Sequence, residues 1–119
     1  MYSAQLLDHF QHPRNAGEIA DPDATAEIEN PACGDVLRLT LNLHAGRITR
    51  AQFKAKGCVA AIACGSALTE LVAGKTLDQV KTLRREDVSA SVGGLPQASA
   101  HAAYLAIEAL TAALSHIKP

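Results

Sequence analysis

Cysteine, aspartate and histidine side chains occur at three separate breaks in the sequence pattern. Cys33 and Asp35 flank a glycine in a Pro–Gly turn, Cys58 directly follows Gly57, and His101 follows a segment rich in glycine and proline. Thiolates, carboxylates and imidazoles are the side chains that bind zinc and iron in proteins. The candidate ligands of a metal site are therefore Cys33, Asp35, Cys58 and His101, and no catalytic residue is assigned.

Alternating apolar residues indicate how the chain could bring these breaks together. Residues 36–43 alternate Val or Leu with Arg, Thr and Asn, which predicts a half-buried strand. Residues 47–56 predict a returning strand after a short turn, and residues 25–30 predict an edge strand. If the two long strands pair as a hairpin, Cys33 and Cys58 both lie beyond its open end and become neighbours.

The remaining segments predict helices and loops around this small sheet. Helices are expected over 3–11, 58–73, 76–83 and, as a long C-terminal helix, from 101 onwards. An exposed turn is expected at 84–87 and a flexible loop at 91–96. The predicted fold class is α+β, with a three-stranded antiparallel sheet packed on one face by helices, in a single domain over residues 1–119.

Two thiols and two imidazoles need separate interpretations. Cys58 falls in the first turn of a helix, where free N–H groups and the helix dipole favour a thiolate. Cys64 lies six residues further, a rise of about 9 Å and a rotation of about 120° away, so a buried structural thiol is expected there. His9 and His12 are expected on the surface, where a cationic imidazole suits the end of the first helix.

Composition narrows the class of protein. The 119 residues carry a formal net charge of -1 and no long Lys/Arg cluster, which argues against nucleic acid as a partner. No apolar run reaches the ~20 residues of a membrane span, and the N-terminus lacks the pattern of a secretion signal, so a cytoplasmic protein is expected. Three cysteines in such a chain indicate metal-binding or reactive thiols, or small buried hydrophobes.

Several segments, in order and with compatible gaps, resemble the IscU/NifU N-terminal family over nearly the whole chain. They are Tyr2-Ser3, Asp8-His9-Phe10, Pro13-Arg14-Asn15-Ala16-Gly17, Asn30-Pro31-Ala32-Cys33-Gly34-Asp35, Lys56-Gly57-Cys58 and Leu95-Pro96. The resemblance implies an IscU/SufE-like fold in a single NifU/IscU-like domain. It also implies a scaffold or carrier that assembles a labile [2Fe-2S] cluster from iron and sulfide and hands it to acceptor apo-proteins.

The resemblance carries the family's ligands over residue by residue. Cys33, Asp35 and Cys58 match its first cysteine, its aspartate and its second cysteine, and His101 matches the histidine of its His-Cys pair. Ala102 stands where the family has its third cysteine. Two thiolates, a carboxylate and an imidazole can hold a [2Fe-2S] cluster, more weakly and with more oxygen sensitivity, or a tetrahedral zinc ion.

The departure at Ala102 leaves a second functional interpretation open. A cysteine desulfurase is the sulfur donor that the resemblance implies, and persulfide sulfur would then pass to Cys58 or Cys33. The alternative is a divergent paralogue that holds zinc or no metal and acts structurally or regulates sulfur mobilisation. An enzyme with Cys58 as nucleophile lacks a recognisable oxyanion donor, so no enzyme activity is expected.

The segment after Leu95-Pro96 departs from the family as well. It reads Gln97-Ala98-Ser99, where IscU proteins have Pro-Val-Lys recognised by a dedicated Hsp70-type chaperone. The chaperone partnership is therefore not carried over to this chain.

Overall fold

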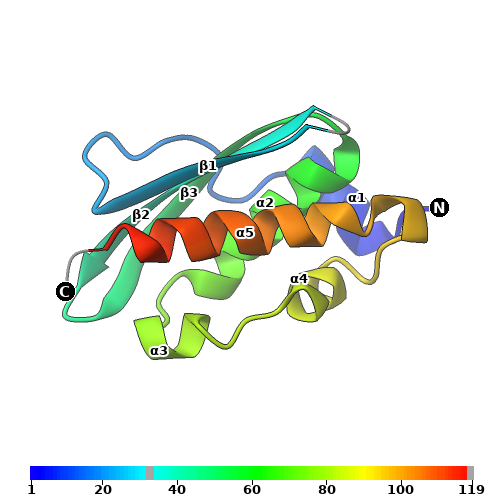
Figure 1. Ribbon diagram of the computed structural model, residues 1–119. Coiled ribbons are helices and arrows are strands. Elements are labelled where there is room, and N and C mark those ends of the chain that lie inside the picture. Colours follow the sequence, from blue (N-terminus) through cyan, green and yellow to red (C-terminus); the bar gives the residue numbers. More distant parts are fainter. Residues whose placement is uncertain (32–33, 118–119) are drawn as a thin grey trace.

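The strands of the chain form one antiparallel sheet (Figure 1). The computed structural model describes residues 1–31 and 34–117, and within them the sheet has three strands in the order β1-β2-β3. The strands are β1 (Ala24–Asn30), β2 (Asp35–His44) and β3 (Arg47–Lys56). Leu37, Leu39 and Leu41 of β2 face the core and are almost completely buried. The predicted strands and their antiparallel pairing are confirmed.

Helices cover one face of the sheet, as Figure 1 shows. They are α1 (Ala4–Gln11), α2 (Val59–Val72), α3 (Leu77–Val80), α4 (Arg85–Ser91) and α5 (His101–Ser115), with a 3-10 turn η1 (Gln97–Ser99) before α5. The long helix α5 packs against α2 and β1. The predicted α+β class is confirmed, and among the described residues no helix is long and apolar enough to span a membrane.

The expected turn at 84–87 is wrong, because these residues begin helix α4. The Asp87 carboxylate accepts the Arg84 backbone N–H at 2.8 Å, which caps the start of the helix. Val88 is completely buried and anchors α4 to the core. The charged sequence therefore starts an amphipathic helix rather than an exposed turn.

The segment between α1 and β1 covers the outer edge of the sheet. The Gly17 N–H donates to the Phe53 carbonyl at 2.8 Å, and the Phe53 N–H donates to the Asn15 carbonyl at 3.0 Å. The Ile19 N–H reaches Thr40 Oγ1 at 3.2 Å, and Thr40 is only 1% exposed although it points away from the helices. This segment thus protects the edge of β3 and part of the second face.

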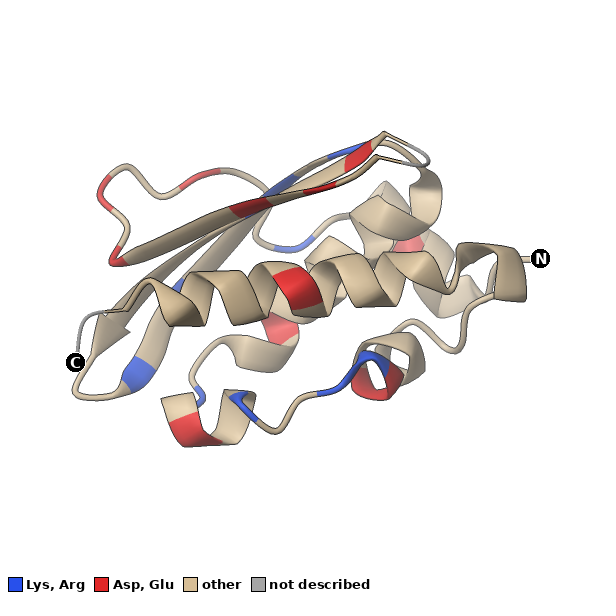
Figure 2. Ribbon diagram, viewed as in Figure 1, with Lys and Arg blue, Asp and Glu red and all other residues tan. Residues whose placement is uncertain are grey.

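Charged side chains are scattered over the described elements, as Figure 2 shows. Arg38 on the second face of the sheet pairs with Glu18 at 3.1 Å and approaches Glu27 at 3.9 Å. Arg38 on this face therefore has two acidic neighbours.

His9 is buried, so its predicted surface position is wrong. Its Nδ1 lies 2.8 Å from Ser66 Oγ, and the same oxygen accepts the Arg14 backbone N–H at 2.8 Å. The Ser66 hydroxyl can therefore donate to a neutral His9, which ties α1 and the following segment to α2. The spacing already contained this signal, because His9 lies three residues after the buried Leu6 and shares its helix face. His12 is exposed, as expected.

Gly65 allows α2 to approach the sheet closely. A Cβ at this position would lie 2.6 Å from Phe53 Cδ2 and 3.0 Å from Leu37 Cδ1. Real Cβ atoms do not come this close, so a side chain here would push α2 away from the sheet.

Gly65→Ala should therefore destabilise the protein. Overpacking costs about 1–3 kcal/mol, whereas the better helix propensity of alanine returns about 1 kcal/mol. The expected net effect is a loss of up to about 2 kcal/mol in the free energy of unfolding, measured by urea denaturation. A gain in stability would show that α2 has room to spare at this contact.

The stability of the protein should fall as the pH drops below about 7, because of His9. Burial lowers the pKa of His9 from its ordinary value of 6.5, with Arg14 adding to the effect. A depressed pKa means that the unfolded chain binds the proton more readily, so the stabilisation is present above the ordinary pKa and is lost as the pH falls. His9→Gln should flatten this dependence, measured by urea denaturation across the pH range, whereas the exposed control His12→Gln should retain it.

Candidate metal centre

The pairing of the strands brings Asp35 and Cys58 to the same end of the sheet. Asp35 begins β2, and its neighbour Val36 pairs with Lys56, the last residue of β3. The chain then passes through Gly57 to Cys58, the N-cap residue of α2, whose Sγ accepts the Ala61 N–H at 3.4 Å. The junction between β3 and α2 therefore lies directly against the start of β2.

His101 reaches the same place from the first turn of α5. Its Nε2 lies 3.1 Å from Asp35 Oδ2 and 4.0 Å from Cys58 Sγ. The Cys58 thiol lies 3.3 Å from the same carboxylate oxygen. One ligand atom from each of Asp35, Cys58 and His101 can thus lie within 4.8 Å of the other two. Cys33, the fourth predicted ligand, lies outside the described residues.

These side chains differ in their access to solvent. The Asp35 side chain is 2% exposed, whereas the His101 side chain is 34% exposed. A hollow of about 290 Å³ lies against His101, between the end of β1 and α5, with the carboxylates of Glu29 and Glu108 on its lining. The Asp35 carboxylate therefore forms the inner side of the group of candidate ligands, and the His101 imidazole forms its outer side.

The group offers one sulfur, one oxygen and one nitrogen ligand. Zinc accepts all three ligand types, and iron–sulfur clusters accept cysteine and histidine. The ligand types therefore fit both zinc and iron. Because the three ligand atoms already lie within 4.8 Å of one another, the side chains could enclose an ion without a large rearrangement.

The expectation that the helix terminus favours a Cys58 thiolate is wrong for the metal-free protein. Burial is the largest effect and raises the pKa of Cys58, and the hydrogen bond and charge of Asp35 raise it further. The Ala61 N–H lowers the pKa but does not outweigh burial. Cys58 is therefore a neutral thiol that can donate its proton toward Asp35 Oδ2.

Two other sequence positions considered for this centre, Cys64 and Ala102, are buried. Cys64 is completely buried and burial raises its pKa to about 12, so the predicted buried thiol is confirmed. Ala102, beside His101, is 1% exposed and belongs to the hydrophobic core. The sequence interpretation used Gly57 as the break after the strand over residues 47–56 and as part of the family segment, but assigned it no role in the centre.

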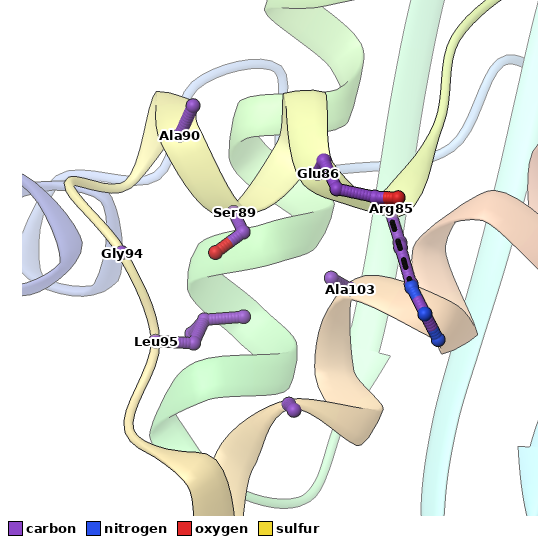
Figure 3. Close-up of a pocket in the computed structure, with 8 residues that line it drawn as sticks. Arg85, Glu86, Ser89, Ala90, Gly94, Leu95 and Ala103 are labelled. Atoms are coloured by element: carbon purple, nitrogen blue, oxygen red, sulfur yellow. Dashed lines mark ion pairs between the residues drawn. The ribbon is translucent and has the colours of Figure 1, made fainter.

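A second hollow, of about 360 Å³, lies between α4 and α5 and is drawn in Figure 3. Small side chains such as Ala90 and Ala103 form much of its lining, with Arg85 at one side. The Arg85 guanidinium lies 4.2 Å from the centre of the Tyr104 ring. Among its described lining residues there is no cysteine or histidine, so this hollow is separate from the candidate metal centre.

Comparison with known proteins places the chain in a family. The family model described as "NifU-like N terminal domain" matches residues 1–118 of the chain. The chain belongs to the NifU-like N-terminal family. The NifU-like chain is 40% identical over 114 residues to "Iron-sulfur cluster assembly scaffold protein IscU 1" of Archaeoglobus fulgidus, covering 96% of the chain and 74% of that relative. It is 36% identical over 121 residues to "Iron-sulfur cluster assembly scaffold protein IscU" of Escherichia coli, covering 98% of this chain and 94% of that relative.

Solved structures support the fold of this NifU-like chain. A NifU-like N-terminal protein from Brucella abortus matches with a TM-score of 0.80 at 20% identity, covering 97% of this chain and 92% of that one. SufU of Fervidobacterium islandicum, described as an iron-sulfur cluster assembly scaffold protein for the SUF system, matches with a TM-score of 0.78 at 20% identity, covering 95% of this chain and 96% of that one. The predicted family resemblance and fold class are confirmed.

Removal of the carboxylate should make the Cys58 thiol more acidic. In Asp35→Ala the negative charge and the hydrogen bond that raise the pKa of Cys58 are both absent. The pH profile of iodoacetamide alkylation of Cys58, followed by mass spectrometry on metal-free protein, should therefore shift to lower pH. Glu29→Ala, which removes a carboxylate outside the group, is the control, and an unchanged profile in Asp35→Ala would contradict the assigned contact.

Proposed function

We propose that this NifU-like chain is a scaffold that assembles an iron–sulfur cluster, a labile [2Fe-2S] cluster in the simplest case, and hands it to acceptor apo-proteins. The proposal is carried by the convergence of Asp35, Cys58 and His101 at one end of the sheet. It is supported by relatives whose names describe iron–sulfur cluster assembly scaffolds. Cys33 completes the proposed ligand set, on the resemblance of its sequence segment.

In this proposal the cluster is bound only until it is transferred, and the ligand types favour its release. A carboxylate and an imidazole in place of two thiolates bind iron less tightly, so transfer to a four-cysteine acceptor is downhill. The Cys58 proton must leave when iron binds, because only the thiolate is a metal ligand. His101, the more exposed ligand, lies on the side from which an acceptor can approach.

A cysteine desulfurase is the proposed source of sulfur. Ala102 has no sulfur atom to accept a persulfide, so sulfur would reach the site through Cys58 or Cys33. Of the described thiols, Cys58 lies in the group of ligands, whereas Cys64 is enclosed in the core. The proposed route therefore uses the thiols of the metal centre itself.

Anaerobic reconstitution tests the function. With ferrous iron, cysteine, a cysteine desulfurase and dithiothreitol, which reduces persulfide sulfur to sulfide, the chain should develop a visible sulfur-to-iron charge-transfer band and pass the cluster to an apo-ferredoxin. Cys58→Ser and Cys33→Ser should each lose most of the band. The matched control Cys64→Ala, which removes the buried thiol, should retain it. A colourless product that retains zinc would overturn the proposed function.

Restoring a third thiol next to His101 should strengthen the site. Ala102→Cys should lengthen the lifetime of the reconstituted cluster in air by several-fold, because a thiolate binds iron more tightly than the mixed set. Ala103→Cys is the control, since Ala103 is equally buried but is not the position that matches the family's cysteine. Equal lifetimes of the two variants would show that position 102 does not face the cluster.

A further inference from the structure

We propose that Gly57 is a positioning residue that holds the Asp35 carboxylate in the metal centre. The proposal rests on the proposed function, because it concerns how one of the candidate ligands is placed. Because Gly57 has no side chain, the Asp35 carboxylate has room at the junction between β3 and α2.

The space beside Gly57 is filled by Asp35. Gly57 has a φ of +135°, and a Cβ added to it would lie 2.1 Å from Asp35 Oδ1 and 2.8 Å from Asp35 Cγ. The same Cβ would lie 2.9 Å from Asp35 Cα. Any side chain at position 57 would therefore displace the carboxylate and the start of β2 together.

The two carboxylate oxygens of Asp35 have different partners. Oδ1 accepts the backbone N–H of Cys58 at 3.0 Å, which anchors it to the N-terminus of α2. Oδ2 is left facing Cys58 Sγ at 3.3 Å and His101 Nε2 at 3.1 Å. One oxygen thus fixes the side chain, and the other is presented to the metal, so Asp35 would act as a monodentate ligand.

Other glycines with positive φ provide a contrast. Gly34, Gly46 and Gly74 have φ between +73° and +80°, and a Cβ on any of them would meet nothing within 4 Å. Gly93 meets Gln5 and Ser3, which lie outside the metal centre. Among the described glycines, Gly57 alone combines a positive φ with a contact to a candidate ligand.

Metal-ion titration with Co²⁺ tests this role on the full chain. Gly57→Ala should weaken Co²⁺ binding by about 10–100-fold, the usual effect of a residue that orients a ligand. Asp35→Ala should weaken binding to a similar extent, and the double variant should be no weaker than Asp35→Ala alone. Gly74→Ala is the control, because it also places a Cβ at a positive φ, of +80° rather than +135°, without any collision, and its Co²⁺ affinity should equal that of the unaltered protein.

A readout without metal reports the placement directly. The Cys58 backbone amide should show slow hydrogen exchange by NMR in the unaltered protein and in Gly74→Ala. Its exchange should become faster in both Gly57→Ala and Asp35→Ala, since each breaks the bond to Oδ1. Slow exchange and unchanged Co²⁺ affinity in Gly57→Ala would overturn the positioning role.

The outcomes separate this proposal from the proposed function. If the unaltered chain binds Co²⁺ through Asp35 but Gly57→Ala behaves like Gly74→Ala, only the role of Gly57 fails. If Asp35→Ala leaves Co²⁺ affinity unchanged, the ligand assignment itself fails. If Gly57→Ala does not fold, Gly17→Ala decides, because Gly17 has a matching φ of +137° and meets only the end of the Gln52 side chain. A folded Gly17→Ala shows that strain at this φ does not by itself unfold the chain, which supports the collision with Asp35, and an unfolded Gly17→Ala overturns it as the cause.

Discussion

The hydrogen bond from the Cys58 backbone N–H to Asp35 Oδ1 connects the start of β2 with the start of α2. It places a carboxylate, which is 2% exposed, beside a thiol and an imidazole. A buried carboxylate is costly unless it is hydrogen-bonded, and here the backbone amide and the two neighbouring side chains satisfy it. The candidate centre therefore depends on how this one side chain is held.

The register of the sheet provides the next level of support. Because Val36 pairs with Lys56, the chain leaves β3 beside Asp35, and the residue that follows must allow the carboxylate to pass close to its backbone. Gly57 does so, and α2 begins immediately afterwards with Cys58 as its N-cap. Gly65 then lets α2 lie close on the sheet. Two glycines thus set the position of the thiol, one locally and one through packing.

The sequence predicted the parts of the structure that depend on local pattern. Alternation along β2 and β3 identified the hairpin, and the break at Gly57 located Cys58 at its open end. The placement of His101 depends on the packing of α5 against β1 and α2, which no local pattern contains. The sequence therefore supplied the residue types of the candidate centre, and the resemblance to relatives supplied the connection between them.

The predictions that were wrong share a physical cause, which is burial. The dipole of α2 alone favours a Cys58 thiolate, but removal of the thiol from water has the larger effect on its pKa. His9 resembles a surface histidine at the end of a short helix, yet it is buried and its ring contacts Ser66 of α2. Charged residues at the start of α4 resemble a turn until Val88 is seen to be buried. Burial is a property of the whole fold, so these three positions required the structure.

Under the proposed function, the mixed ligand set would allow a chain with Ala102 in place of a cysteine to serve as a scaffold, because weaker ligands favour release of the cluster. Iron-edge anomalous diffraction from crystals of the anaerobically reconstituted protein tests most directly whether this set binds iron. We predict that Asp35 Oδ2, Cys58 Sγ and His101 Nε2 each lie within bonding distance of an iron peak, shared between the two irons of the cluster. Iron bound away from these three atoms, or no iron after reconstitution, would contradict the assigned centre.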